Sequence, residues 1–381
     1  MKKIKVMSVF GTRPEAIKMA PLVLELNRRE DMDSVVCVTA QHREMLDSVM
    51  EVFGLRADHD LNIMAPSQTL SDITSRVLRE LGAVLQSEKP DLVLVHGDTT
   101  TTFSAALAAF YEKIPVGHVE AGLRSYDRYS PFPEEMNRCM TARLAALHFA
   151  PTAKNAGNLR AEGISDGVFI TGNTVIDAMR YTVGGESFSD KFLSGFDFSG
   201  KRVIAMTCHR RENYGEPMEN IFRAVRAIAD ARPDVEFIYP VHLSPAVREC
   251  AGRLLGGHER IHLIEPLDAM DMHRLMAKSY MVMTDSGGIQ EEAPALGKPV
   301  LVLRRETERP EAVEAGTVLL AGTARENIES LALSLLDDRG KYAAMSKAVN
   351  PYGDGRACAR IADAIEFRFG LRAEAPEEFR P

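Results

Sequence analysis

Three carboxylates and one histidine occupy positions in the chain that suit proton transfer. Asp98 and Glu120 each follow a short apolar stretch, and His209 does so further along. Glu134 follows the abrupt turn Ser130-Pro131-Phe132-Pro133. Carboxylates that meet in a closing site raise one another's pKa values, which makes them effective acids and bases. Each residue alone is more often a cap or an ion-pair partner, so the inference depends on all four reaching one site.

The cations near these positions suit an anionic ligand. Arg13 and Lys18 belong to the first half of the chain, whereas His209, Arg210 and Arg309 belong to the second. Arginine makes forked contacts with phosphate, and both residue types neutralise its charge. Solvated charged turns explain each cation taken singly. Together the cations favour a diphosphate.

A glycine turn in the second half has the composition of a phosphate-binding turn. Ser286-Gly287-Gly288 follows the apolar run Tyr280-Met281-Val282-Met283 and precedes a short predicted helix. Glycines let backbone N–H groups approach a ligand, and a helix N-terminus favours negative charge. Glu292, one turn into that helix, can accept hydrogen bonds from both hydroxyls of a ribose. An ordinary strand–turn–helix connection is the alternative interpretation of this stretch.

Several classes of cofactor and partner are not supported. The chain lacks a Walker A motif, a G-x-G-x-x-G motif and zinc-type spacing, so we expect no metal and no redox cofactor. The net charge of −8 argues against a broad nucleic-acid surface. The first apolar run ends at Phe10 and no run is long enough for a bilayer, so we expect neither a signal peptide nor a membrane partner. Five scattered cysteines favour a reduced, cytoplasmic setting.

Short apolar strands alternate with helical patterns throughout the 381 residues. This alternation predicts an α/β fold of two Rossmann-like, doubly wound domains that face a cleft, where ligands would bind. We expect an N-terminal domain over residues 1–170 and a C-terminal domain that binds a nucleotide diphosphate over 171–359. A helix at about 360–381 is expected to pack back on the first domain, and residues 184–201 are predicted to form a surface linker.

Eight short motifs combine the candidate residues with their neighbours. The motifs are GTRPEAIKMAP (11–21), HGDTTTT (96–102), HVEAGLR (118–124), PFPEEMNR (131–138), TGNTVIDA (171–178), HRREN (209–213), TDSGGIQEEAP (284–294) and ERPE (308–311). Each motif is weak alone, but the set is strongly specific, and together the motifs resemble the bacterial non-hydrolysing UDP-N-acetylglucosamine 2-epimerases. The resemblance runs from about Lys5 to Arg360 in order and without large gaps.

The resemblance implies a glycosyltransferase-B-type fold and an isomerase that interconverts UDP-GlcNAc and UDP-ManNAc. In the family the enzyme removes the C2 proton and expels UDP to give 2-acetamidoglucal, and UDP then adds back. By matching position Asp98, Glu120 and Glu134 are the acid/base candidates, and His209 acts at the departing diphosphate. Which carboxylate serves which face of C2 stays open.

The same resemblance implies the substrate-binding positions. The candidates around the sugar and diphosphate are Arg13, Lys18, Arg210, Ser286, Gly287, Gly288 and Arg309. Glu292 is expected to bind the ribose, and Leu267 to contact the base through its backbone. Met272 stands where the family commonly has Phe near the base, which implies weaker stacking.

Many bacterial members are also activated by a second UDP-GlcNAc. The matching positions here are Gln41, Glu44, Ser67, Glu134, Arg210 and His242. Glu44 and Ser67 replace an expected Gln and Arg, so a cation is lost and an anion gained. We therefore predict weak or altered activation.

Other functions compatible with these residues are a hydrolysing UDP-GlcNAc 2-epimerase, a UDP-sugar transferase and a non-catalytic UDP-sugar sensor. A transferase leaves the three carboxylates unexplained, and a sensor need not bury them. The resemblance further implies a homodimer and a role in making cell-wall or capsule polysaccharide.

Overall fold

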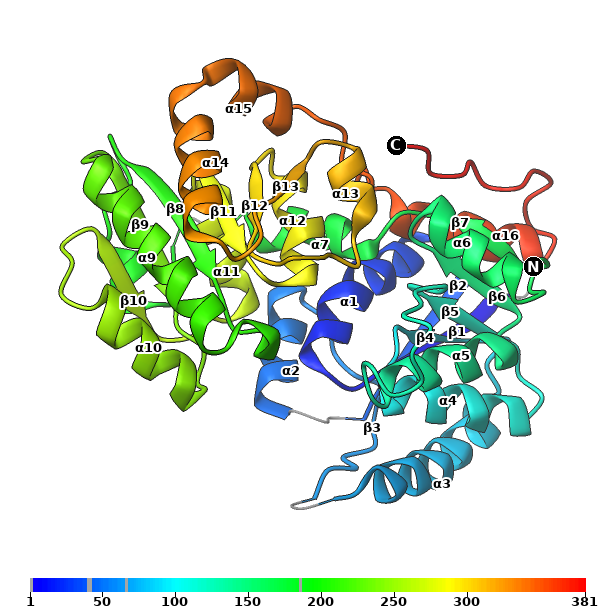
Figure 1. Cartoon of the computed structure of the whole chain (residues 1–381). Coiled ribbons are helices and arrows are strands. Elements are labelled where there is room, and N and C mark those ends of the chain that lie inside the picture. The colour runs from blue at the N-terminus through cyan, green and yellow to red at the C-terminus, as the bar shows by residue number, and fades with distance from the viewer. Residues whose placement is uncertain (1–2, 40–42, 66–67, 185–186) are drawn as a thin grey trace. The chain divides into compact units, whose positions relative to one another are not determined.

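The computed structural model describes residues 3–39, 43–65, 68–184 and 187–381. Its contacts divide the chain into two compact units. The first unit comprises Met1–Ala178 together with Tyr352–Pro381, and the second comprises Met179–Pro351. Each unit consists of a parallel sheet with helices packed against it (Figure 1).

The sheet of the first unit has the strand order β3-β2-β1-β4-β5-β6-β7, and every described pairing in it is parallel. The order reverses between β1 and β4, as in doubly wound folds, and such a switch point is where ligands bind. The strands are β1 (Ile4–Phe10), β2 (Met32–Val38), β3 (His59–Asp60), β4 (Leu92–His96), β5 (Val116–Val119), β6 (Leu147–Ala150) and β7 (Val168–Ile170).

Helices connect these strands and begin at residues that suit helix N-termini. Thr12 caps the helix that follows β1 through a capping box with Glu15, and Thr99 caps the helix that follows β4. The helices are α1 (Arg13–Arg28), α2 (Arg43–Val52), α3 (Leu70–Glu88), α4 (Thr100–Tyr111), α5 (Glu134–Leu144), α6 (Ala153–Ala161), α7 (Thr174–Thr182) and α16 (Ala357–Arg368).

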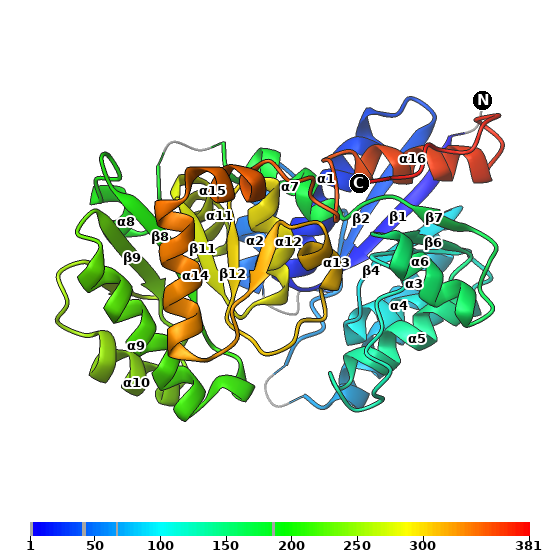
Figure 2. The same ribbon diagram turned by 45° about the horizontal axis from the view of Figure 1, so that its top comes forward.

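The second unit repeats this plan with the strand order β10-β9-β8-β11-β12-β13, again parallel (Figure 2). Its strands are β8 (Arg202–Thr207), β9 (Val235–Pro240), β10 (Ile261–Ile264), β11 (Met281–Thr284), β12 (Val300–Val302) and β13 (Val318–Leu320). Its helices are α8 (Lys191–Gly195), η1 (Arg211–Asn213), α9 (Glu216–Ala231), α10 (Pro245–Leu255), α11 (Ala269–Lys278), α12 (Gly287–Ala295), α13 (Pro310–Glu314), α14 (Arg325–Asp337) and α15 (Arg339–Ser346).

The central strands are largely apolar because helices cover the sheets. In the second unit Phe222, Phe237 and Tyr239 are fully buried in a core that also takes in α9 and α14. Met7, Val93 and Leu81 belong to the corresponding core of the first unit. These cores make a rigid support for the loops at the carboxyl ends of the strands.

The C-terminal residues complete the first unit. Arg29, the C-cap residue of α1, donates to Asp363 and Glu366 of α16, each at 2.9 Å. Asp177 accepts hydrogen bonds from the backbone N–H groups of Ala357 and Cys358 at 3.1 and 3.0 Å. Through such contacts residues 171–178 and 352–359 group with the first unit, whereas the sequence had assigned them to the second domain.

The stretch predicted as a surface linker has structure of its own. Within its described part, α8 begins at Lys191 and buries Leu193. The rings of Phe188 and Phe198 stack with centroids 5.8 Å apart. The prediction was wrong here because the glycines and serines of this stretch obscured the buried Phe188 and Leu193.

Candidate functional site

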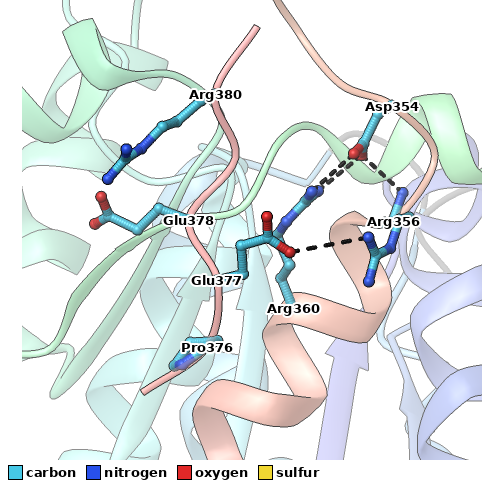
Figure 3. Close-up of a pocket in the computed structure, with 7 residues that line it drawn as sticks. All are labelled: Asp354, Arg356, Arg360, Pro376, Glu377, Glu378 and Arg380. Carbon is cyan, nitrogen blue, oxygen red and sulfur yellow. Dashed lines mark hydrogen bonds and ion pairs between the residues drawn. The ribbon is translucent and has the colours of Figure 1, made fainter. Parts of the chain in front are cut away.

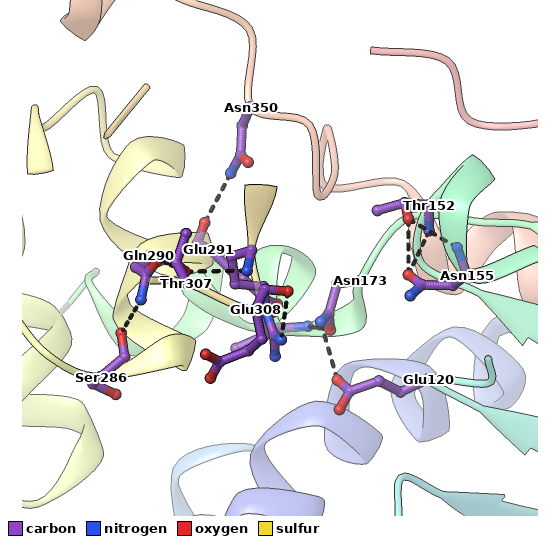
Figure 4. A network of polar contacts seen from close by, with 12 residues as sticks. Glu120, Thr152, Asn155, Asn173, Ser286, Gln290, Glu291, Thr307, Glu308 and Asn350 are labelled. Atoms are coloured by element: carbon purple, nitrogen blue, oxygen red, sulfur yellow. Dashed lines mark hydrogen bonds and ion pairs between the residues drawn. The ribbon is translucent and has the colours of Figure 1, made fainter. Parts of the chain in front are cut away.

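Glu120 is held by donors from two other segments of the first unit. It directly follows β5, and its side chain is 16% exposed. Its Oε2 accepts hydrogen bonds from Lys18 of α1 and, at 3.0 Å, from the amide of Asn173 (Figure 4). The backbone of Glu120 has a φ of 62°, a left-handed conformation that costs a non-glycine residue energy. Such strain often occurs at functional sites, and here it aims a carboxylate at the carboxyl edge of the sheet.

Asp98 follows β4 and is anchored from α5. Arg138 donates to its Oδ2 at 2.7 Å, and the amide of Asn137 donates to its backbone oxygen at 2.9 Å. Burial raises the pKa of Asp98, the Arg138 cation opposes this, and the charges of Glu120 and Glu134 raise it further. Asp98 is therefore more easily protonated than an ordinary aspartate.

Glu134 is the first residue of α5 and is half-buried. The next residue, Glu135, is buried and accepts the N–H groups of Ser125 and Tyr126 at 3.0 and 2.9 Å. Glu135 thus fixes the loop that leads into α5 and, with it, the start of the helix. The charges of Glu120 and Glu134 both act on Asp98, so the first unit brings these two carboxylates near enough to Asp98 to affect its pKa.

Lys18 and Arg13 lie in α1, whose start is set by a buried glutamate. Glu15 accepts the backbone N–H groups of Gly11 and Thr12 at 3.1 and 2.7 Å. It also accepts the hydroxyl of Thr99 at 2.7 Å, which ties the loop after β1 to the loop after β4. Burial raises the pKa of Glu15, and these donors oppose the rise. Lys18 reaches Glu120, whereas Arg13 is half-buried in the first turn of α1.

His96 is a site residue to which sequence reasoning gave no role. It ends β4, is 3% exposed, and its Nε2 makes no hydrogen bond while lying 3.7 Å from Oε2 of Glu120. Burial lowers the pKa of His96 to about 4, so its ring is neutral at neutral pH. The feature of the sequence that could have identified His96 is its place as the first residue of the HGDTTTT motif.

In the second unit, a buried aspartate places the predicted histidine and arginine. Oδ2 of Asp285 accepts the backbone N–H groups of His209 and Arg210, each at 2.8 Å, and the amide of Asn213 at 3.0 Å. Nδ1 of His209 lies 3.3 Å from Oδ1 of the same carboxylate. Asp285 lies within the TDSGGIQEEAP motif but received no role from the sequence, because only the pairing of β8 with β11 reveals its partners.

His209 is neutral by virtue of its surroundings. Burial lowers its pKa, Asp285 opposes this, and Arg210 and His242 lower it further. The rings of His209 and His242 stack with centroids 5.4 Å apart. A neutral imidazole beside an arginine can accept a proton when an anion binds next to it.

The predicted phosphate turn begins a helix. Gly287 is the first residue of α12, and Ser286 is its N-cap residue but makes no side-chain capping hydrogen bond. Glu292, half-buried on α12, places Oε2 3.4 Å from Nε2 of the buried His273. His273 of α11 in turn contacts the Thr182 hydroxyl of α7 at 2.8 Å. These contacts position Glu292, the predicted ribose acceptor.

Arg309 and Arg210 are ion-paired within the second unit. Arg309 contacts Glu291, whose backbone oxygen accepts the amide of Asn350 at 2.9 Å (Figure 4). Nη2 of Arg210 lies 3.9 Å from Oε1 of Glu308. The base-binding candidates Leu267, which follows β10, and Met272 of α11 are both half-buried.

The positions predicted for a second nucleotide sugar are only partly described. Gln41 and Ser67 lie outside the described residues, and Glu44 is the second residue of α2. His242 is exposed beside His209, in the second unit. Weak or altered activation stays a prediction.

A separate pocket of about 510 Å³ lies against the C-terminal tail (Figure 3). Arg360 makes two 2.7 Å contacts with the Asp354 carboxylate there, and Arg356 lies 3.9 Å from Glu377. The pocket is lined by Asp354, Arg356, Arg360, Pro376, Glu377, Glu378 and Arg380, and no candidate site residue is among them. Its paired charges do not favour an anion.

Across the described residues, no group of three or more histidine, cysteine, aspartate or glutamate side chains is arranged to hold a metal ion. Within the same residues, no helix has the length and apolar character needed to cross a membrane.

Two doubly wound parallel sheets define an α/β protein of the glycosyltransferase-B type. The first unit carries the three predicted carboxylates, and the second carries a glycine turn with Arg210 near it. The predicted fold class is confirmed by solved structures of the same architecture. The structure of S. aureus MnaA with UDP covers 100% of both chains with a TM-score of 0.85 and 56% identity. The UDP-GlcNAc 2-epimerase of Neisseria meningitidis bound to UDP-GlcNAc covers 95% of this chain and 99% of its own, with a TM-score of 0.84 and 50% identity.

The chain belongs to the UDP-N-acetylglucosamine 2-epimerase family. The family model of that description matches residues 24–366. The UDP-N-acetylglucosamine 2-epimerase of Bacillus subtilis is 57% identical over 380 residues, which cover 100% of this chain and 99% of the relative. The resemblance drawn from the eight motifs is thereby confirmed.

Proposed function

We propose that the protein interconverts UDP-GlcNAc and UDP-ManNAc by elimination and re-addition of UDP. The observation that carries the proposal is the carboxylate set of the first unit in a chain of this family. Both carboxylates contact a cation, Glu120 contacting Lys18 and Asp98 contacting Arg138, but burial still favours the protonated form of Asp98. A carboxylate beside a lysine and a carboxyl group that is easier to protonate suit one base and one acid.

In the proposed reaction, a carboxylate takes the proton from C2 of the sugar. The C2–H electron pair forms the C1–C2 double bond, the C1–O bond breaks, and UDP leaves with its electron pair. The products of this step are 2-acetamidoglucal and UDP. Re-addition of the UDP oxygen at C1, with a proton delivered to the other face of C2, gives the epimer. We infer that Glu120 is the base and Asp98 the acid in one direction, with Glu134 assisting Asp98 through its charge.

The second unit is proposed to hold the nucleotide. Arg210 and a protonated His209 would stabilise the negative charge that develops on UDP as the C1–O bond breaks. The turn Ser286-Gly287-Gly288 supplies backbone donors to phosphate, and Glu292 accepts the ribose hydroxyls. The remaining assignments, to Arg13, Leu267, Met272 and Arg309, rest on the motif resemblance.

The wider setting is also a proposal. A cytoplasmic location is supported by five free cysteines, three of which are buried. A homodimer and a role in wall or capsule polysaccharide synthesis rest on the resemblance.

The test is proton NMR of the full chain with UDP-GlcNAc in D2O. Formation of UDP-ManNAc with deuterium at C2 is expected. Free ManNAc with UDP would identify a hydrolysing enzyme instead. Binding without any change in the sugar would contradict an epimerase and favour a UDP-sugar sensor.

A further inference from the structure

The start of α12 already carries a carboxylate from the chain itself. A side-chain carbon added at Gly287 would lie 2.9 Å from Oε1 of Glu308 and 3.8 Å from Nη2 of Arg210. Gly287 is the first helical residue, and its N-cap Ser286 supplies no side-chain cap. The Glu308 oxygen therefore lies against the helix N-terminus, where a negative charge is favoured.

The cations around Glu308 are those that an anionic ligand would use. Oε1 lies 3.9 Å from Nη2 of Arg210, and Oε2 contacts Arg304. Burial would raise the pKa of Glu308, but its own backbone N–H and the nearby Arg304 and Arg309 hold that pKa below the usual range. Glu308 is therefore a carboxylate at neutral pH.

We propose that Glu308 is an internal competitor for the diphosphate: it occupies the phosphate position in the free protein and leaves it when the nucleotide binds. This inference rests on the proposed function, which puts the UDP phosphates at Ser286–Gly288 and Arg210. A phosphate and the Glu308 carboxylate would repel each other while sharing Arg210 and the α12 N-terminus.

The competition has a consequence for turnover. UDP is expelled and re-added within the proposed reaction. A site that binds UDP too tightly would stabilise the complex with expelled UDP more than the transition state, and re-addition would be slower. Glu308 weakens UDP binding and offers Arg210 a partner in the free protein. It can move readily, because its side chain is 43% exposed and Arg304, its other partner, keeps a second ion pair at 2.6 Å with Glu212.

The opposite role is also physically possible and gives the opposite result. If Glu308 served to orient Arg210 and Arg304 toward phosphate, its loss would weaken nucleotide binding. Glu308→Gln removes the charge and keeps the size of the side chain. Glu306→Gln is the matched control, since it removes the same charge from an exposed position in the same loop.

The experiment is isothermal titration calorimetry of the full chain and both variants with UDP, and with uridine as a probe lacking phosphate. We expect Glu308→Gln to bind UDP about 10-fold more tightly, with the gain reduced at about 0.5 M NaCl. Glu306→Gln should bind UDP within about twofold of the wild type, and uridine should bind all three proteins alike. In steady-state assays Glu308→Gln should have a lower KM for UDP-GlcNAc.

Unchanged or weaker UDP binding by Glu308→Gln would overturn the competitor role. An equal gain for uridine would do so too, because it would show a general rearrangement rather than relief of phosphate repulsion. If the wild type and both variants fail to bind UDP, the proposed nucleotide site is wrong and the competitor role is wrong with it.

Discussion

Asp285 is predicted to place the diphosphate-binding residues of the second unit, and its replacement tests this directly. The carboxylate is fully buried and accepts three hydrogen bonds, at 2.8, 2.8 and 3.0 Å, from His209, Arg210 and Asn213. In Asp285→Asn an amide oxygen still accepts, but the charge that strengthens all three bonds is gone. Charge-assisted bonds exceed neutral ones by roughly 0.5–1 kcal/mol each, so we expect a loss of about 2 kcal/mol in unfolding free energy.

The same substitution should lower UDP affinity. Asp285 orients the backbone N–H groups of His209 and Arg210. If this loop loosens, its contacts with the nucleotide are no longer pre-organised and the affinity falls. We expect the Kd for UDP to rise about 10-fold, equivalent to roughly 1.4 kcal/mol. Urea denaturation gives the stability, and calorimetric titration gives the affinity.

The matched control is Asp177→Asn in the first unit. Asp177 is also buried and accepts two backbone N–H groups, from Ala357 and Cys358. The control should lose about 1–2 kcal/mol of stability by the same mechanism and keep its UDP affinity within about twofold. The reasoning is refuted if Asp285→Asn loses less than about 0.5 kcal/mol and binds UDP like the wild type.

Three further predictions concern ionisation and the carboxylate site. Burial raises the pKa of Asp98, so its contribution to stability is present below its unfolded pKa and is lost as pH rises through its folded pKa. The melting temperature of the wild type should therefore fall relative to that of Asp98→Asn between about pH 4 and pH 7, and a constant difference would contradict this. His96→Leu removes the ring nitrogen 3.7 Å from Glu120 and should lower kcat/KM about 10-fold, whereas His96→Gln should retain most of it. Equal losses of kcat/KM in the two His96 variants would show that the ring contributes packing and no polar interaction with Glu120. His209 is neutral because burial lowers its pKa, so UDP binding near about pH 6.5 should take up a proton. Calorimetry in buffers of different ionisation enthalpy measures this uptake, and heats independent of the buffer would contradict it.

The architecture was predictable because its signals are local. Runs such as Leu92–His96 are apolar, short and followed by polar turns, which identifies buried parallel strands and their carboxyl ends. The same pattern indicated Asp98, Glu120 and His209, since each lies one or two residues after the end of such a strand. The motif resemblance then supplied the order of the sites along the chain.

The partners of those residues were not predictable, because they come from elements distant in sequence. Asn173 meets Glu120 across 53 positions, and Asp285 meets His209 across 76. His96 appeared to be the last apolar-strand residue, and only its burial beside Glu120 gives it a role. Glu308 is a surface glutamate in sequence terms, and its contact with Gly287 depends on how the loop after β12 folds.

Positional isotope exchange tests the central claim, the breaking of the C1–O bond, most directly. UDP-GlcNAc carrying ¹⁸O in the bridge between C1 and the β-phosphorus is incubated with the full chain, and the remaining substrate is analysed by ³¹P NMR. Elimination of UDP predicts that the label moves from the bridge to non-bridging β-phosphate positions, and that Glu120→Gln abolishes the movement. Conversion to UDP-ManNAc with the label retained wholly in the bridge would contradict elimination and require epimerisation without loss of UDP.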